Sequence, residues 1–232
     1  MQASLLSAYA AKIDHTLLKP DTTLDQIKQL CQEAKQHKFA AVCFAPCWSN
    51  YVSNLIIGDE IRRATVVGFP HGNSYFLEKS NSANAYCSLG VNELDVVVNI
   101  GMVKSGEWYS IKGEVELFEK LKQYRKNSAN QDVVVKYIVE VGYLTDDELF
   151  RIADILIEHK IDFIKTCTGY GPRNVGLEDI VKIKKHVGDA IKIKASGGIK
   201  NADFFLALIE MGADRVGTSS SVKIMEELGA MP

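Results

Sequence analysis

The chain has 232 residues, of which 47% are hydrophobic and 24% are charged, and its formal net charge is −2. This balance excludes intrinsic disorder, and no apolar run approaches the roughly 18 residues that a membrane span needs. The near-neutral charge gives no electrostatic footprint for nucleic acid. We therefore expect neither nucleic acid nor a membrane among the partners.

Eight short runs rich in β-branched residues alternate along the chain with amphipathic stretches. In residues 22–38, for example, the apolar side chains recur three and four positions apart, which is typical of a helix packed on one side. Thr145 and Glu148 form a capping-box pattern, and Gly188 and Gly212 are placed to end later helices. The eight predicted strands are Ile13–Leu18, Ala40–Pro46, Ala64–Pro70, Glu93–Asn99, Val133–Val141, Asp162–Thr166, Ala190–Ser196 and Asp214–Ser219.

Several predicted strands are almost continuously apolar, including residues 96–98 and 133–135. Such strands fit a parallel sheet that is buried on both faces. Eight strand–helix units in this length favour a closed barrel over an open sheet, and no G-x-G-x-x-G motif follows the first strand. We therefore predict an α/β protein, a (β/α)8 TIM barrel formed as a single domain by residues 1–232.

Four of the predicted strands contain charged residues among the apolar ones. A charge that faced the apolar helix layer would cost several kcal/mol, so we expect these side chains to point into the barrel and find partners there. Catalytic groups of such barrels lie at the C-terminal ends of the strands. The residues are Asp95, Lys136, Lys165, Lys192 and Lys194.

Lys165 and Lys194 lie near the ends of consecutive strands, which should be neighbours about 4.8 Å apart. Two ammonium groups about 5 Å apart repel by roughly 3 kcal/mol at an effective dielectric constant of 20, so the pKa of one should fall. A neutral amine is what attack on a carbonyl requires, and the pair therefore indicates Schiff-base chemistry. Lys192 shares the face of Lys194 but should lie deeper in the barrel.

A purely structural alternative stays open for these charges. In that alternative, lysines bridge Asp95 and Glu140 inside a plugged barrel and perform no chemistry. Several inward lysines together with a carboxylate favour the catalytic interpretation, because perturbed groups gather at functional sites.

Glycine-rich segments follow the last strands, where barrels often bind a phosphate with backbone N–H groups. Residues 196–198 read Ser-Gly-Gly and residues 217–220 read Gly-Thr-Ser-Ser, and residues 168–171 form a third such segment. Each segment alone is a weak signal, because tight turns need glycine anyway. Two on consecutive loops predict a phosphate site.

The remaining candidates are weaker. Asp14, His15 and Thr16 could line the cavity, although His15 equally fits the core; His71 is a ligand or a turn residue. Neither histidine belongs to a metal-binding set, so we expect no metal. Cys43 is expected to be a buried hydrophobic residue.

The five cysteines show no CxxC pair and no zinc-like spacing, which indicates reduced thiols. The N-terminal segment has no basic stretch before its short apolar run, unlike a signal peptide. We therefore predict a cytoplasmic protein.

Eight motifs, in order and over nearly the whole chain, together resemble deoxyribose-phosphate aldolases. The most specific surround the two lysines, FIKTCTGYG at 163–171 and IKASGGI at 193–199. The others are IDHTLLKP (13–20), AVCFAP (41–46), GFPHG (68–72), ELDVVVNIG (93–101), VKYIVEVGYL (135–144) and VGTSSSV (216–222).

The resemblance implies a (β/α)8 class I aldolase that reversibly cleaves 2-deoxy-D-ribose 5-phosphate to D-glyceraldehyde 3-phosphate and acetaldehyde. It implies that Lys165 forms the Schiff base, that Lys194 lowers its pKa, and that Asp95 transfers protons, with Lys136 and Asp14 in support. It implies a phosphosugar partner and no cofactor. The implied substrate and phosphate contacts are Thr168, Gly169, Gly197, Gly198, Gly217, Ser219 and Ser220.

Three positions depart from the family pattern. Cys167 replaces a serine, and Tyr170 stands where some members have a phosphate-binding lysine, so phosphate binding should be weaker or differently arranged. The sequence ends at Met231-Pro232 without the tyrosine-tipped tail of some members, so we expect a different rate of proton exchange at the enamine.

Two other functions stay open at this point. One is a Schiff-base lyase for another phosphorylated aldehyde or keto acid, and the other is an inactive barrel that only binds a phosphosugar. The sequence does not decide between a monomer and a homodimer.

Overall fold

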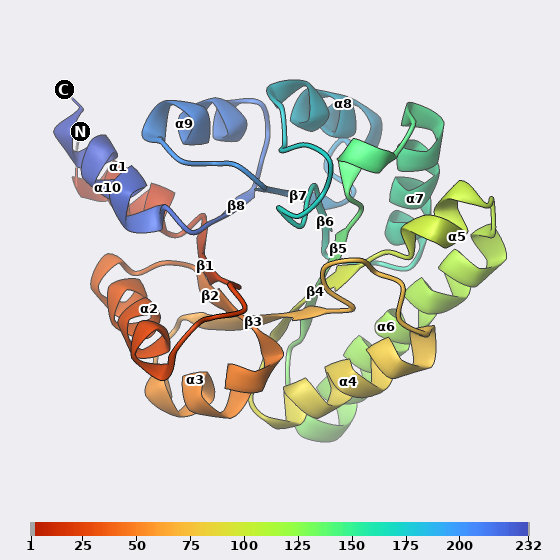
Figure 1. Cartoon of the computed structure of the whole chain (residues 1–232), viewed down its shortest axis with the longest axis horizontal. Coiled ribbons are helices and arrows are strands. Elements are labelled where there is room, and N and C mark those ends of the chain that lie inside the picture. Colours follow the sequence, from red (N-terminus) through yellow and green to blue (C-terminus); the bar gives the residue numbers. More distant parts are fainter. Residues whose placement is uncertain (1–2, 232) are drawn as a thin grey trace.

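The computed structural model describes residues 3–231, in which eight parallel strands form a closed barrel surrounded by helices (Figure 1). The strands follow one another around the barrel in chain order, which confirms the predicted (β/α)8 fold. Residues 1, 2 and 232 of the predicted single domain lie outside the described residues. The strands are β1 Ile13–Leu17, β2 Ala41–Phe44, β3 Arg62–Val67, β4 Glu93–Val97, β5 Val134–Ile138, β6 Phe163–Lys165, β7 Lys192–Ser196 and β8 Arg215–Thr218.

The helices form the outer layer and connect successive strands (Figure 1). Within residues 3–231, no helix is both long and apolar enough to cross a membrane. The helices are α1 Ala3–Ala10, α2 Leu24–His37, α3 Ser49–Leu55, α4 Phe76–Ser88, α5 Ile100–Lys104, α6 Trp108–Ala129, α7 Asp146–Glu158, α8 Leu177–Val187, α9 Ala202–Glu210 and α10 Ser221–Ala230, with short 3-10 helices η1 Pro46–Trp48 and η2 Val141–Tyr143.

Local sequence signals begin and end these helices. The Thr145 side chain accepts a hydrogen bond from the backbone N–H of Glu148 while the Glu148 side chain caps Thr145, which confirms the predicted capping box of α7. Gly188 and Gly212 follow the ends of α8 and α9, as predicted.

Most strands end before the predicted boundary. β5, for example, ends at Ile138 rather than at Val141, and β4 ends at Val97 rather than at Asn99. The reason is that buried apolar residues continue into the loops: Val98 and Val139 are fully buried although they follow the paired strands. Apolar runs therefore mark burial rather than strand ends. Single backbone hydrogen bonds to the neighbouring strand continue past these ends, from Val98 to Ile138 and from Val139 to Lys165.

The barrel interior has an apolar half and a charged half. The apolar half comes from β2 and β3, whose side chains Ala41, Cys43, Ala64 and Val66 pack together in a cluster of their own. The other strands place ionisable side chains inside the barrel, all of them buried or nearly so. These are Asp14, Glu93, Asp95, Lys136, Lys165, Lys194 and Arg215.

The outward faces of the strands form the large hydrophobic core, which includes Ile193 on β7. Substitutions of Ile193 can measure how much this core contributes to stability. Ile193 is 0% exposed. We expect Ile193→Ala to lower the free energy of unfolding by about 2–5 kcal/mol and Ile193→Val by about 0.5–1.5 kcal/mol, because a larger cavity remains in the first variant. Urea unfolding measures both. Val181→Ala on α8, at a side chain that is 45% exposed, is the control and should change stability by less than about 0.5 kcal/mol. Equal losses in all three variants would contradict this account.

Candidate active site

The charged side chains inside the barrel form one connected cluster around Asp95. Its Oδ2 accepts hydrogen bonds from the Nζ atoms of Lys165 and Lys194, each at 2.7 Å, and its Oδ1 accepts one from Lys136 at 3.1 Å. Lys194 also lies 2.5 Å from Oδ2 of Asp14. The parallel pairing of β6 with β7 places Lys165 beside Lys194. The structure thus brings together all five residues predicted for the chemistry.

Two further residues that the sequence did not single out belong to this cluster, and half-buried Arg62 approaches it from β3, 3.3 Å from Glu93. Glu93 contacts Lys136, and Arg215 contacts Asp14 and Glu93, the latter at 3.3 Å. Glu93 lies two positions before Asp95 on the same strand, so the same alternation that indicated Asp95 could have indicated Glu93. Arg215 begins β8, where nothing in the sequence distinguishes it from an exposed strand-end residue.

The cluster contains four cationic groups and three carboxylates. Lys136, Lys194 and Arg215 each contact at least two of the carboxylates. Lys165, in contrast, contacts Asp95 alone. If every group were ionised, the buried cluster would carry an excess positive charge, and Lys165 is the cation that is least compensated.

The pKa values follow from this arrangement. Burial lowers the pKa of Lys165, Asp95 raises it and Lys194 lowers it, and the result lies below the ordinary value for lysine. Burial also opposes the charge of Lys194, but Asp14 and Asp95 outweigh it, so the pKa of Lys194 is raised. Burial contributes more to this shift than the repulsion between the two lysines from which the sequence predicted it.

The carboxyl group of Asp95 stays ionised. Burial raises its pKa, but the ammonium groups of Lys136, Lys165 and Lys194 outweigh burial and hold the pKa well below its usual range. An ionised carboxylate at 2.7 Å from two amines can accept a proton from either of them.

A cavity of about 240 Å³ opens at the C-terminal ends of the strands, and Lys165 lines it. Ser220 does not line this cavity: it lies at the start of α10 and donates its N–H to Oγ of Thr218 at 2.9 Å. The other residues predicted for substrate and phosphate contacts do line it, namely Thr168, Gly169, Gly197, Gly198, Gly217 and Ser219.

The loops after β7 and β8 present free hydrogen-bond donors. In the described part of the chain, the N–H groups of Gly198 and Ser219 have no hydrogen-bond partner. Gly198 has φ +76°, and a Cβ there would overlap the side chain of Asn174, so this position requires glycine. Lys19 and Lys200, which the sequence analysis missed, also line the cavity and add positive charge. These N–H and ammonium groups line one side of the cavity and are suited to bind an anion.

The loop after β6 forms the opposite wall. Thr168 donates its N–H and its hydroxyl to Glu140, so neither donor points to the cavity. Tyr170 is 54% exposed and reaches across the cavity mouth: its ring packs edge to face on Phe69, and its hydroxyl lies 3.4 Å from the carbonyl oxygen of Leu18.

The structure corrects two expectations from the sequence and decides two others. Lys192 is exposed at the opposite end of the barrel from the cavity, and its ammonium lies over the Phe163 ring at 5.6 Å, so the expected deep position was wrong. Glu140 pairs with no lysine among the described residues, so the suggested lysine bridge to it was also wrong. His15 faces the helix layer and contacts Glu33 at 2.7 Å, as a core histidine does. Cys43 is fully buried, as predicted.

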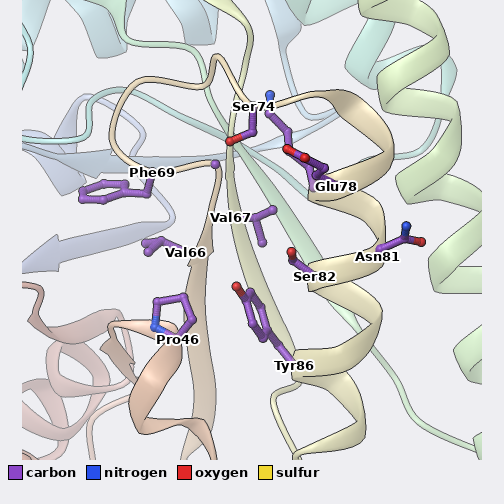
Figure 2. Close-up of a pocket in the computed structure, with 11 residues that line it drawn as sticks. Pro46, Val66, Val67, Phe69, Ser74, Glu78, Asn81, Ser82 and Tyr86 are labelled. Atoms are coloured by element: carbon purple, nitrogen blue, oxygen red, sulfur yellow. The ribbon is translucent and has the colours of Figure 1, made fainter.

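A larger hollow of about 580 Å³ lies between β3 and α4 (Figure 2). Figure 2 shows Ser82 and Tyr86 of α4 on one side and Val66 and Pro46 on the other. The lysine beside it, Lys79, is buried and donates to the Val97 carbonyl at 2.9 Å and to Glu114 at 2.7 Å. Because that amine is fully engaged, this hollow offers no group for carbonyl chemistry.

The geometry is that of a (β/α)8 barrel with a buried amine at its C-terminal mouth, which is the arrangement that lysine carbonyl chemistry needs. A model of the DeoC/LacD family of aldolases matches residues 9–218. The chain belongs to this family of aldolases, as the sequence motifs predicted.

Named relatives and solved structures agree with this family. A deoxyribose-phosphate aldolase of Caldanaerobacter subterraneus subsp. tengcongensis is 41% identical over 94% of this chain and 92% of its own length. One of Staphylococcus carnosus is 38% identical over 95% of this chain and 96% of its own length. The tetrameric deoxyribose phosphate aldolase of Aeropyrum pernix superposes with a TM-score of 0.87 at 27% identity, over 97% of this chain and 92% of that chain.

The Lys194→Met variant tests how the cluster controls Lys165. Without the neighbouring ammonium, Lys165 loses a repelling charge and shares Asp95 with Lys136 only, so the pKa of Lys165 should rise. An amine is neutral above its pKa, so the pH profile should move to higher pH, with about a tenfold lower rate per pKa unit on the acidic side. The rate of trapping of an aldehyde by borohydride, followed between about pH 6 and pH 10, measures the shift.

The matched control for this prediction is Lys192→Met, which removes an exposed lysine from the same strand. Its pH profile should equal that of the unaltered protein. A Lys194→Met profile that coincides with the control would show that Lys194 does not influence Lys165.

Proposed function

We propose that the protein is a class I aldolase that reversibly cleaves 2-deoxy-D-ribose 5-phosphate to D-glyceraldehyde 3-phosphate and acetaldehyde. One observation carries the proposal: Lys165, the least compensated cation of the buried cluster, lines a cavity whose far wall presents anion-binding groups. The names of the relatives support the same substrate.

The first step is attack of the neutral Lys165 amine on the C1 aldehyde of the open-chain sugar. A carbinolamine forms as one amine proton moves to the carbonyl oxygen, and its hydroxyl group then takes a second proton from solvent and leaves as water, which gives an iminium ion. Asp95 contacts Nζ of Lys165 and is ionised, so it is placed to accept the amine proton and to pass it to the carbonyl oxygen. Lys194 keeps its charge and holds Asp95 in position.

The second step breaks the C2–C3 bond of the sugar. The ionised carboxylate of Asp95, acting through a water molecule, takes the proton of the C3 hydroxyl, and C3 of the sugar becomes the aldehyde carbon of glyceraldehyde 3-phosphate. The electrons of the C2–C3 bond move into the iminium to give an enamine on Lys165. Protonation of the enamine at C2 and hydrolysis release acetaldehyde and the free amine. The iminium is the electron sink, so these steps use no metal or organic cofactor.

The phosphate group is proposed to bind at the loops after β7 and β8. The free N–H groups of Gly198 and Ser219 would donate to its oxygens, and the exposed ammonium groups of Lys19 and Lys200 would balance its charge. These lysines would supply the charge that Tyr170 does not.

A cytoplasmic location stays a prediction, and a homodimer is one of the two assembly states between which the sequence does not decide. All five cysteines are free thiols, which supports a reducing compartment. The relative from Aeropyrum pernix is described as a tetramer, so members of the family do assemble. Analytical ultracentrifugation of the full chain would measure the state of this one.

Borohydride trapping tests the nucleophile and the reaction class together. We expect incubation with deoxyribose 5-phosphate and borohydride to leave a reduced adduct on Lys165, because borohydride reduces the iminium to a stable secondary amine. Peptide mapping by mass spectrometry locates the adduct. Lys165→Met should abolish it, whereas Lys192→Met should leave it unchanged.

Other outcomes of this experiment would favour the alternatives. Saturable binding of the sugar phosphate without an adduct or turnover would indicate an inactive binding barrel. An adduct with a keto acid but no acetaldehyde from deoxyribose 5-phosphate would indicate a different lyase.

The phosphate contact can be tested separately with Lys200→Met. Loss of one charged contact of about 1 kcal/mol should raise the KM for deoxyribose 5-phosphate about fivefold. The KM for unphosphorylated deoxyribose should not change, since that sugar has no phosphate to bind. Lys185→Met removes an exposed lysine of α8 outside the cavity and should have no effect on either substrate. Equal effects on both sugars would place the phosphate elsewhere.

A further inference from the structure

Glu140 is a buried acidic residue that the proposed reaction does not use. It lies just after β5, is 1% exposed and has a left-handed backbone with φ 54° and ψ 67°, which residues with side chains rarely adopt. The backbone on both sides of it is tied to the strand of the proposed nucleophile: Val139 donates its N–H to the Lys165 carbonyl at 2.9 Å, and Val141 donates to the Thr166 carbonyl at 3.0 Å. Glu140 is therefore fixed directly beside the end of β6.

The carboxylate of Glu140 holds the loop that follows Lys165. Its Oε2 accepts the backbone N–H of Thr168 at 3.0 Å and also the Thr168 hydroxyl. The Oγ of Thr168 in turn accepts the N–H of Tyr170 at 3.0 Å. One carboxylate oxygen thus sets the conformation of residues 168–170, which form one wall of the cavity.

The loop also turns closely around this carboxylate. A Cβ on Gly171 would lie 2.5 Å from Oε1 of Glu140, so the Gly171 position accepts no side chain. In the described part of the chain, no cation contacts Glu140, and its Oε1 has no hydrogen-bond partner. A buried carboxylate without a cation is costly, so an apolar residue would fill this space at less cost if packing were its only role.

We propose that Glu140 is a positioning residue of the aldolase site: through Thr168, it holds residues 168–170 in the conformation that binds the sugar phosphate. This proposal rests on the proposed function. Glu140 touches neither the amine of Lys165 nor the free donors of the phosphate loops, so its effect passes through the loop. Attack of Lys165 on the substrate carbonyl should therefore depend on Glu140 much less than binding of the rest of the substrate does.

Two substitutions of Glu140 separate its hydrogen-bonding role from its bulk. Glu140→Gln keeps an oxygen that can accept from Thr168, whereas Glu140→Leu has a similar size and no acceptor. We expect the KM for deoxyribose 5-phosphate to rise about tenfold or more in Glu140→Leu, which removes both hydrogen bonds to Thr168, and less than about threefold in Glu140→Gln, which keeps an acceptor for them. Trapping of acetaldehyde on Lys165 by borohydride should proceed at nearly the original rate in both variants, because this two-carbon aldehyde lacks the part of the sugar phosphate that residues 168–170 are proposed to bind.

Glu114 supplies the matched control. It is also a buried carboxylate, but it pairs with Lys79 between the helices and the outside of the barrel. Glu114→Leu should lower stability in urea unfolding without changing the KM. A Glu140→Leu variant with an unchanged KM would overturn the proposal, and so would equal KM increases in Glu140→Leu and Glu114→Leu.

A second pair of variants keeps the test decisive if Glu140→Leu does not fold. Thr168→Ser retains the hydroxyl that bonds to Glu140, whereas Thr168→Val removes it. We expect a raised KM only in Thr168→Val, and similar KM values for the two variants would overturn the proposal.

The unaltered protein separates a failure of the proposed function from a failure of the role of Glu140. If the unaltered protein forms no acetaldehyde adduct on Lys165, the proposed function fails. If it forms the adduct and the KM values do not move, only the role of Glu140 fails.

Discussion

Three carboxylates and four cationic side chains share a space inside the barrel that water hardly reaches, and the rest of the site depends on how they divide the charge. Asp95 is central because it contacts three of the cations. Removing ions from water is expensive, so each cation needs carboxylate partners, and Lys165 has the fewest. The same imbalance that penalises its charged form lowers the pKa of Lys165 and so favours the neutral amine.

The distribution of residues around the barrel serves this cluster. β2 and β3 contribute small apolar side chains such as Ala41 and Ala64 to the barrel interior. These side chains pack beside the charged cluster and help to keep water away from it. The remaining strands supply the charges, and the parallel register sets Lys165 against Lys194 and Asp95 against Lys136. Reaction chemistry is thus built on rigid strands, while substrate binding is left to the loops at their C-terminal ends.

Those loops are held by groups that do not react. Glu140 fixes the loop after β6 through Thr168, and Tyr170 links that loop to the segments after β1 and β3 across the cavity mouth. Two sequence departures from the family pattern, Tyr170 and Cys167, both lie in this loop, and the amine-bearing strand before it keeps the family motif. Both departures therefore lie outside the buried cluster of charges.

The sequence by itself determined the fold, the number and order of the strands and the inward direction of Asp95, Lys136, Lys165 and Lys194. It could do so because burial imposes a period of two on strands and because charges inside apolar runs have few places to go. The tertiary structure alone decided which charges meet. Arg215 joins Asp14 from far along the chain, Lys192 reaches solvent although it shares a face with Lys194, and Glu140 bonds to a loop rather than to a lysine. These outcomes depend on depth along the barrel and on contacts across it, and neither is encoded in local spacing.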